Sequence, residues 1–599
     1  MDKKTLLAIV ISVVVISLGF FLQNIIFPKP DNAVKTEVTT EAQPGSEISG
    51  ESGTRTGDTA ESTSFTAGLP VAVEDDAILQ EIRTETDLFF VTLSTRGAGI
   101  TSLKLKEHKT GDEPVEMILK NDPNQSAFLL NFGGNINKPV TDLFHVTQQG
   151  ENVFTFYKDY YFPSSEDREK NGFRLSKTYT FKPGEYVFEV QVTIQSNTNE
   201  APDLNFDGFS YGLATMPQIG PDFAKLDGRY DYRRYYTFAN DKRKTLNLNK
   251  TTYQEVTDRL IWCGVSGKYF ELLGVPDATL YTYAFRRTVG QNVRENSEMF
   301  FLRPVIKSSK QIDTFMFYAG PKLAKPLVRY NDAAKNRFEL QDVYLDKSVD
   351  RSRILGWLES ILKWILVLFY RLIPNYGVAI ILLTVVIKIV LFPFTYKSYQ
   401  STSKMQGLTP KINEIKEKYK DNPQKMNQET SALYKKEGVS PLGGCLPLIL
   451  QMPIFFALYG LLNSHFDLRG AKFLWWIFDL SAPESIWNFA PFKIPFLGWT
   501  DLRLLPFIFV GTQLLSSKFM QTPGAASGTG ANMKLMTYLM PVVFFFILYD
   551  APSGLILYWT VTNVLTMVQQ YYTSRRKKAK DAIPPPMKIV RKLPPKKKK

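Results

Sequence analysis

Long apolar segments near the N-terminus and in the last third of the chain constrain the fold more than any other feature of the sequence. Residues 6–27 contain no charged side chain, and a helix of that length crosses the roughly 30 Å hydrocarbon core of a bilayer. Mean hydropathy over all 599 residues is slightly negative, so the rest of the chain must be largely polar. Further apolar segments are residues 375–392, 446–466, 502–519, 535–549 and 555–572. We therefore predict a multi-spanning α-helical membrane protein with six spans.

The first span is expected to be an uncleaved anchor comprising residues 1–28. Its apolar run is too long for the core of a signal peptide, and no cleavage motif of small residues follows it. Residues 29–76 hold ten acidic and three basic side chains among many Ser, Thr and Gly residues, without apolar periodicity. Such a composition cannot bury enough apolar surface to fold, so we predict a disordered acidic linker.

Residues 77–345 have the alternating pattern of half-buried β-strands. Apolar side chains occupy every second position of residues 186–194, and a turn at residues 182–185 joins them to an earlier strand that contains Tyr179 and Phe181. Similar short segments are residues 89–94, 100–105, 153–157, 299–306 and 312–318. We predict a large extracytoplasmic domain with an antiparallel β-sandwich fold.

A shorter helix is expected at residues 351–373, before the second span. Its apolar side chains are interrupted by Glu359, Lys363 and Arg371, so no uncharged run in it is long enough to span. Pro374 separates it from the following span. We expect this amphipathic helix to lie flat at the membrane interface, and residues 374–572 to form a five-span core.

The distribution of Lys and Arg orients the six spans. Residues 396–440 contain nine lysines and residues 573–599 contain twelve basic side chains, whereas loop 467–501 contains three. Because basic segments remain on the cytoplasmic side, both termini are predicted to be cytoplasmic and the β domain lies outside. Residues 396–440 are expected to form a cytoplasmic helical hairpin. The basic tail, residues 573–599, is expected to bind ribosomal RNA or anionic lipid, unless it serves only to fix the topology.

Lys388 is a charged residue inside the second predicted span. A cation at mid-bilayer costs roughly 2.5–3.5 kcal/mol on insertion scales, so it marks a functional site by default. Alternatively, its long side chain reaches the inner interface, because Pro393 follows only five residues later. No Asp or Glu occurs within any predicted span to neutralise it, which favours a wet cavity. Other polar side chains in the spans, which must face protein or water, are Thr384, Gln451, Thr512, Gln513, Tyr558, Thr560, Thr562 and Asn563.

The sequence contains no common catalytic or metal-binding motif. It has no nucleotide-binding loop, HExxH motif or nucleophile elbow. Three histidines leave little room for a histidine-based metal site, and Cys263 and Cys445 fall in different predicted compartments. The absence of carboxylates in the spans argues against a proton-coupled pump. We therefore expect no cofactor, no metal and no enzymatic activity.

Three motifs in the C-terminal part resemble those of the YidC family of bacterial membrane insertases, relatives of the mitochondrial oxidase-assembly and chloroplast Albino proteins. They are KMQGLTPKINEIKEKY at residues 404–419, SPLGGCLPLILQMPIFFALY at residues 440–459 and PSGLILYWTVTN at residues 552–563. The resemblance extends over residues 351–572. The N-terminal anchor, the outer β domain and the motif WCGVSGKYF at residues 262–270 resemble the Gram-negative form of the family.

The resemblance implies a hydrophilic groove that is open to the cytoplasm and to lipid but closed on the outer side. The central positive residue of that groove, usually Arg, corresponds to Lys388, which keeps the charge but lacks the planar guanidinium. The groove threonine and glutamine correspond to Thr384 and Gln451. The aromatic pair that contacts the substrate corresponds to Tyr558 and Trp559. The outer domain is expected to resemble a sugar-binding β-supersandwich, which by itself implies no carbohydrate ligand.

The sequence thus predicts an insertase and chaperone for integral membrane proteins, located in the bacterial inner membrane with its β domain in the periplasm. Its expected partners are nascent membrane-protein clients, the Sec translocon and accessory subunits, the ribosome and membrane lipid. A small-molecule transporter is a second possibility, but the inverted repeats usual for that class are not evident. An envelope binding protein is a third, but it would need one anchoring span and no buried lysine.

Overall fold

The structure is a computed structural model that describes residues 68–581. Its gaps are residues 164–171, 224–225, 227–230, 249–250, 290–294, 351–354, 440–445, 495–498 and 521–540. The predicted anchor, most of the predicted linker, Cys445 and the tail beyond Asp581 lie outside the described residues. Among those described, the residues up to Asp350 and the residues from Leu355 form two compact units.

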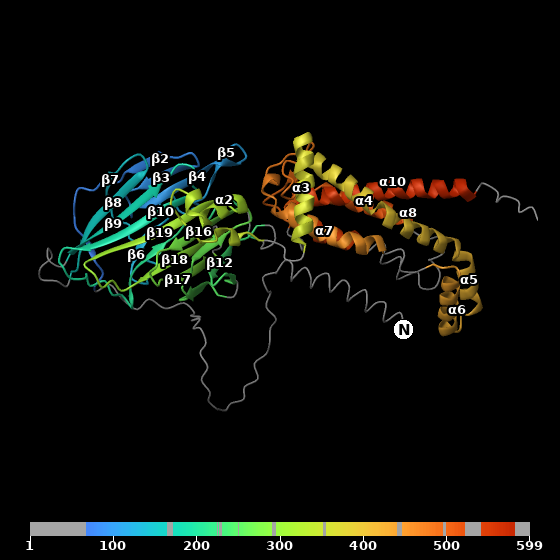
Figure 1. Ribbon diagram of the computed structural model, residues 1–599, viewed down its shortest axis with the longest axis horizontal. Coiled ribbons are helices and arrows are strands. Elements are labelled where there is room, and N and C mark those ends of the chain that lie inside the picture. The colour runs from blue at the N-terminus through green and yellow to red at the C-terminus, as the bar shows by residue number, and fades with distance from the viewer. Residues whose placement is uncertain are drawn as a thin grey trace, which may run out of the picture. The chain divides into compact units, whose positions relative to one another are not determined.

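The first unit consists of antiparallel β-sheets (Figure 1). Its main sheet follows the order β1 (Val71–Ala72), β8 (Val153–Tyr161), β9 (Gly172–Phe181), β10 (Val187–Ser196), β19 (Lys310–Pro321), β16 (Phe270–Pro276), β15 (Trp262–Ser266), β12 (Arg234–Ala239) and β13 (Lys242–Leu246), with β7 (His145–Gln148) also paired to β8. A second sheet contains β14 (Tyr253–Val256), β17 (Thr282–Thr288), β18 (Asn296–Pro304), β11 (Phe209–Ala214) and β6 (Leu130–Phe132). A third contains β2 (Glu81–Glu85), β3 (Phe89–Ser94), β4 (Gly99–Thr110) and β5 (Glu113–Glu116).

The first two sheets pack face to face through aromatic and sulfur-containing side chains. Phe301 on β18 lies edge-on to Phe315 and Phe317 on β19, with ring centroids 5.4 and 5.6 Å apart. Cys263 Sγ on β15 lies 3.3 Å from Met299 Sδ on β18. Alternation along each strand places these side chains on inner faces. The packed antiparallel sheets agree with the β architecture that the alternating sequence pattern predicts.

The hairpin predicted at residues 179–194 forms as expected. Strands β9 and β10 pair in antiparallel register with Phe188 opposite Phe181. Gly184 in the connecting turn has φ +70°, a conformation that residues with a Cβ rarely adopt. The inward-facing residues of β10 are buried, so this hairpin lies at the centre of the main sheet.

The predicted boundaries of the β domain are wrong at both ends. Strand β1 pairs with β8, and Asp75 Oδ1 accepts a 2.7 Å bond from Lys158 Nζ, so part of the predicted linker belongs to the folded unit. At the other end, Asp350 pairs with Arg243 (2.6 Å) and Lys322 (3.2 Å). Composition missed both ends because strand pairing and an ion pair hold the first, and ion pairs hold the second, so neither leaves an apolar pattern in the sequence. The short helices before Asp350 are α2 (Ala324–Val328), η1 (Arg329–Asn331), η2 (Ala333–Lys335) and η3 (Leu345–Ser348).

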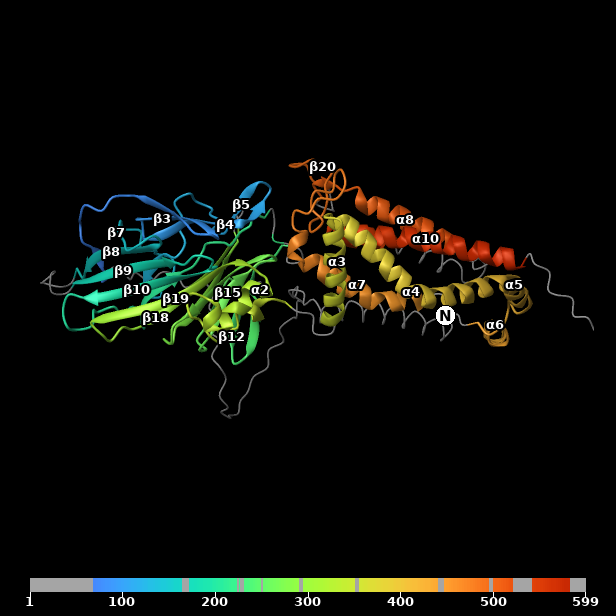
Figure 2. The same cartoon turned by 45° about the horizontal axis from the view of Figure 1, so that its top comes forward.

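The second unit is helical (Figure 2). Its elements are α3 (Gly356–Leu372), α4 (Tyr376–Gly407), α5 (Thr409–Lys418), α6 (Pro423–Lys436), α7 (Leu446–Ser464), η5 (Phe466–Leu468), the β-bridge strands β20 (Trp487–Asn488) and β21 (Asp501–Leu502), α8 (Leu505–Met520), a helix at residues 541–548, and α10 (Ser553–Asp581). Among the described helices, one stretch is long and apolar enough to cross a membrane, Tyr376–Tyr396, while Ile449–Leu462 and Leu505–Ser517 are shorter apolar stretches. The number of six spans therefore remains a prediction.

Two helices extend beyond the ends that the sequence predicts. Helix α4 continues through Pro393, where the second span was expected to end, as far as Gly407. A proline removes one backbone donor, and the Thr395 hydroxyl, two residues later, donates to Leu391 O at 3.1 Å. Helix α10 reaches Asp581 and so includes the first residues of the predicted tail, because no Gly or Pro interrupts the chain there.

Within the hairpin predicted at residues 396–440, the structure has helices α5 and α6 after the end of α4. Helix α6 begins after Asn422, whose side chain accepts a 3.0 Å bond from Lys425 N as an N-cap. Lys411 Nζ lies 3.1 Å from Glu437 Oε1 and links the two helices at their open end. No side chain of α5 or α6 is buried, so the charged side chains of the hairpin are accessible to solvent.

Candidate functional site

Lys388 is the charged residue of the apolar part of α4, and its side chain is directed toward α10. Helix α10 packs along α4 (Figure 1). Lys388 Nζ donates a 2.8 Å hydrogen bond to Thr566 Oγ1, and the residue is half-buried. At 1.5 Å per residue, Lys388 and Thr566 each lie about 20 Å from the first residues of their helices. The ammonium group therefore lies far from the first residues of both helices, and its bond partner is a neutral hydroxyl.

Three further polar contacts continue along α10. Toward the start of the helix, Gln451 Nε2 lies 3.4 Å from Tyr558 OH, and Asn563 Nδ2 lies 3.3 Å from Thr512 Oγ1. Beyond Lys388, toward the end of α4, Gln569 Nε2 donates a 2.8 Å bond to Thr395 Oγ1. With the Lys388–Thr566 bond, helix α10 thus supplies two partners to α4 and one each to α7 and α8. These contacts form a polar line of about 17 Å between Tyr558 and Gln569.

Trp559, which follows Tyr558 on α10, packs against aromatic side chains of α7 and α8. The Trp559 indole stacks on Phe455 with ring centroids 4.5 Å apart and on Phe509 at 5.5 Å. Tyr558 is fully buried. The pair that family resemblance assigns to substrate contact therefore joins α7, α8 and α10 in this conformation, and its contact with a client remains a prediction.

Not every predicted site residue takes part in the line of contacts. Thr384 is fully buried and donates to Ile380 O of its own helix at 2.6 Å. Gln513 is half-buried on α8, beside Thr512. Thr560 donates to Ile556 O within α10 at 2.8 Å. These threonines satisfy their hydroxyl groups locally, as is usual in apolar helices.

Sequence reasoning missed Thr395, Thr566 and Gln569. The spacing of Asn563, Thr566 and Gln569 is three residues, which places them on one face of a helix. A polar face of that kind in an apolar helix could have been recognised. Their pairing with Lys388 and Thr395 could not, because it depends on how α4 and α10 pack.

The loop between α7 and α8 covers the beginning of α10. Ser553 N and Gly554 N, the first donors of α10, bond to Ala482 O and Leu480 O, each at 2.9 Å. A Cβ on Gly554 would lie 2.9 Å from Leu480 O, so a larger residue would push the loop away. Glu484 Oε1 accepts a 2.7 Å bond from Leu505 N at the start of α8. This end of the polar line is thus closed by hydrogen-bonded loop backbone.

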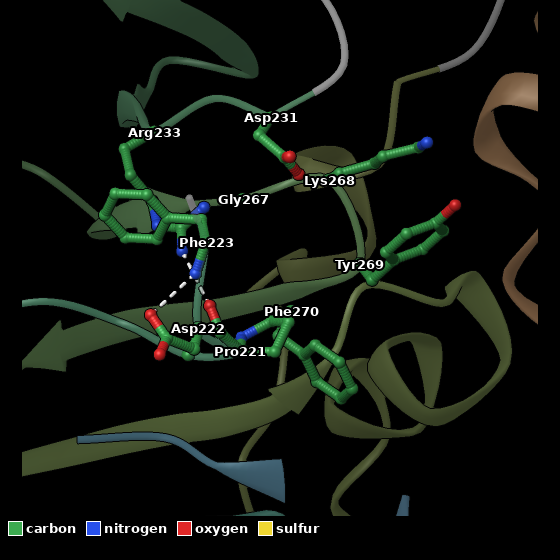
Figure 3. A pocket seen from close by; sticks show the side chains of 10 residues that line it. Pro221, Asp222, Phe223, Asp231, Arg233, Gly267, Lys268, Tyr269 and Phe270 are labelled. Atoms are coloured by element: carbon green, nitrogen blue, oxygen red, sulfur yellow. Dashed lines mark hydrogen bonds between the residues drawn. The ribbon is translucent and has the colours of Figure 1, made fainter. Parts of the chain in front are cut away.

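The β unit contains a small cavity around Arg233 that is not a comparable site (Figure 3). Its volume is about 20 Å³, close to that of one water molecule. The Arg233 guanidinium donates to Gln218 Oε1 (3.0 Å) and to Ile219 O (2.8 Å), and it lies over the Phe223 ring. Its donors are used within the domain, so it has a structural role.

Comparisons with known proteins identify relatives of both units. Residues 368–580 match the family described as 60Kd inner membrane protein, and residues 81–368 match the family described as YidC periplasmic domain. The membrane protein insertase YidC of Treponema denticola is 39% identical over 584 residues, which cover 95% of this chain and 98% of that protein. The membrane protein insertase YidC of Treponema pallidum is 35% identical over 614 residues, with 95% and 98% coverage.

Two solved structures also align with this chain at low similarity. A crystal structure of an active YidC insertase with its first transmembrane domain resolved covers 85% of this chain and 95% of that chain, at 16% identity and a TM-score of 0.35. A galactose mutarotase-like protein from Lactobacillus casei covers 40% of this chain and 100% of that chain, at 12% identity and a TM-score of 0.31.

Proposed function

Because this chain belongs to the YidC family of membrane protein insertases, we propose that it inserts its clients through a hydrophilic groove centred on Lys388. The groove is lined by the polar residues of α10 and their partners on α4, α7 and α8. Because it belongs to this family, the chain is a membrane protein. Family membership supports the function of an insertase and not that of an enzyme of a known class. The proposal concerns the path of the client and the residues that receive it.

The observation that carries this proposal is the Lys388–Thr566 contact. A cation deep in an apolar helix requires a compensating environment, and its described bond partner is a neutral hydroxyl at 2.8 Å. A carboxylate of a client about 4 Å from the ammonium group would gain about 4 kcal/mol at an effective dielectric of 20, against about 1 kcal/mol in bulk water. The site is therefore suited to a polar or acidic client segment that has left the bulk solvent.

Insertion then proceeds without covalent chemistry. The client's short polar outer segment enters the groove, where Lys388 and its neighbours offset part of the cost of dehydration. The apolar helix of the client moves into lipid beside the groove, and its burial at ~25 cal/mol per Å² supplies the driving force. The loop bonds at Ser553 and Gly554 support closure on the outer side. Opening of the groove toward the cytoplasm and lipid is what the resemblance to the YidC family implies.

We further propose six spans, with both termini in the cytoplasm and the β domain in the periplasm of the inner membrane. The nine lysines of residues 396–440 support this orientation. Helix α3 would lie at the outer interface, because its buried side chains Leu362 and Leu366 face the helical unit. Its exposed apolar side chains recur once per turn at Trp357, Ile361, Trp364, Leu368 and Leu372.

The hairpin α5–α6 and the basic tail are proposed to meet the ribosome, the Sec translocon and lipid. Exposure of both hairpin helices supports a docking role over the mouth of the groove. Replacing the turn at residues 419–423 by continuous helix should reduce client capture, and unchanged insertion would refute the docking role. Removing residues 573–599 should weaken ribosome co-sedimentation, most at low salt, because phosphate contacts are screened by salt. Unchanged co-sedimentation would leave the tail with a topological role only.

The path itself can be tested by photo-crosslinking. A photoreactive residue at position 563, on the polar line, should crosslink a single-span client during insertion into liposomes that contain the purified protein. Position 571 is a matched control, because Tyr571 lies on the same helix and is 50% exposed. A client that crosslinks equally from both positions, or only from position 571, would show that it does not pass through the groove.

A further inference from the structure

The loop that closes the groove also carries a group of exposed apolar side chains. Within residues 471–480, the side chains of Ile477 and Leu480 are buried in the helical unit, whereas Trp475 is 84% exposed and Phe478 is 61% exposed. We call the exposed group the aromatic surface. Its members are Leu474, Trp475, Phe478, Ile486, Trp487 and Phe492. Large apolar side chains exposed along one loop mark an interaction surface.

The loop backbone holds Trp475 outward. Trp475 has φ +47°, a left-handed conformation that costs a residue with a Cβ of order 1 kcal/mol or more. The turn around it is closed by a 2.9 Å bond from Phe473 N to Ile477 O and a 3.0 Å bond from Ile477 N to Leu474 O. These two backbone bonds hold the turn, and with it the exposed Trp475, in this conformation.

The same loop is held at the level of the helix ends. Leu480 O and Ala482 O bond to the first residues of α10, and Glu484 bonds to the first residue of α8. Trp475 and Phe478 lie within seven residues of Leu480 and Ala482 in the chain. The aromatic surface therefore cannot extend far from the ends of the helices into solvent.

We propose that the aromatic surface inserts into the outer leaflet of the membrane, at the boundary between headgroups and acyl chains. Trp and other amphipathic aromatic side chains favour that depth. Lys472 and Lys493 are exposed next to the surface in the chain and would meet anionic headgroups. The aromatic surface is thus a membrane-embedded part of the protein. The designation "outer" rests on the proposed orientation of the spans, whereas the insertion into lipid does not.

The depth of the loop can be measured directly on the full-length protein. Spin labels are attached at Trp475→Cys and, separately, at Trp487→Cys on the β20–β21 hairpin, in a Cys445→Ser background; Cys263 is fully buried and should not be labelled. Lys242→Cys, exposed on strand β13 of the β unit, is the control. The protein is placed at one copy per nanodisc containing phosphatidylethanolamine and phosphatidylglycerol. Collisions with oxygen and with a water-soluble nickel chelate are then compared.

Positions 475 and 487 should collide preferentially with oxygen and little with the nickel chelate, and position 242 should show the reverse. Nickel accessibility at 475 and 487 equal to that at 242 would overturn the proposal. Protection that arises only when discs hold two copies would also overturn it, because the surface would then contact a second chain. No client is present, so this measurement can succeed even if the groove mechanism fails.

Discussion

Two lysines without an acidic bond partner, one in each unit, show how differently a buried cation can be used. Lys177 on β9 is fully buried, and its ammonium donates to Gly97 O at 3.0 Å and to Phe128 O at 2.5 Å. Burial lowers the pKa of Lys177 well below its ordinary value. Lys388 is only half-buried, and its described hydrogen bond goes to the Thr566 hydroxyl.

The two lysines differ in which segments their hydrogen bonds connect and in whether a ligand can reach the ammonium group. The Lys177 bonds join strand β9 to two other segments of the same core, and the side chain has no exposed surface. Lys388 joins two helices through one neutral group and keeps part of its surface open. The first arrangement stabilises a fold, whereas the second leaves the charge available to a ligand. An unneutralised cation is therefore evidence of function only where it can be reached.

Other buried charges in the β unit support this view, because they are paired. Arg303 Nε lies 2.9 Å from Asp313 Oδ2, which also accepts a 2.6 Å bond from Tyr211 OH. Arg329 Nη2 lies 2.6 Å from Glu185 Oε1. Breaking such a pair leaves an uncompensated charge and is strongly destabilising. These groups maintain the domain that precedes the helical unit in the chain.

The largest expected effect is a difference in stability between variants in which each lysine is replaced by Met. Lys177→Met should lower the free energy of unfolding of the β unit by about 4 kcal/mol, because two buried carbonyl groups lose their donor. Lys388→Met should leave the stability of the helical unit unchanged or slightly higher, since it removes an expensive charge. Hydrogen exchange of the β9 and α4 amides in the full-length protein measures both. Equal destabilisation by the two substitutions would break the comparison.

The next prediction concerns the pH dependence of the β unit. Burial raises the pKa of Glu271 to about 7, although Lys322 and the hydroxyls of Ser348 and Ser266 oppose the shift. Between about pH 4.5 and 7 the folded state holds a proton that the unfolded state has lost, so stability falls as pH rises through this window. The full effect is about 3 kcal/mol.

Glu271→Gln tests this assignment because it cannot titrate. At pH 8 the variant should be more stable than the wild type, and the difference should disappear near pH 4.5. Asp350, which also faces this site, has a pKa lowered by Lys322, Arg243 and Arg234, so it titrates below this window. Urea unfolding of both proteins at several pH values gives the comparison. Parallel stability curves would show that Glu271 has an ordinary pKa.

The smallest effect is expected for Thr566, whose hydroxyl accepts the hydrogen bond from Lys388 in the groove. Thr566→Val keeps the shape of the side chain but removes the acceptor for Lys388, which should lower insertion of an acidic client about three- to tenfold. Thr560→Val is the matched control, because the Thr560 hydroxyl bonds within its own helix. Protease protection of the inserted client measures both variants. A loss that is equal in the two would indicate a general packing defect.

Much of the architecture could be predicted from the sequence because it depends on local patterns. Period-two alternation located β3 and the β9–β10 hairpin, and Pro374 marked the break before α4. Lys177 could also have been noticed, because it occupies an inward position of its strand between Leu175 and Tyr179.

The rest depends on contacts between distant segments. The Lys388–Thr566 bond requires the packing of α4 on α10, and the ion pair of Asp75 with Lys158 requires the closed sheet. Glu484 was not predicted either, since its role at the start of α8 appears only when the loop folds back. Residue types identified candidates such as Gln451, but only packing determines their partners.

The central claim, that the charge of Lys388 receives the client, is tested most directly by exchanging that charge. Four proteins are reconstituted into liposomes: the wild type, Lys388→Arg, Lys388→Met and Lys388→Glu. Two single-span clients that differ only in having an acidic or a neutral translocated segment are then scored by protease protection. The account predicts that Arg retains insertion of both clients, whereas Met lowers insertion of the acidic client by roughly tenfold and Glu lowers it further. Equal insertion of both clients by the wild type, the Met variant and the Glu variant would contradict the charged-groove mechanism.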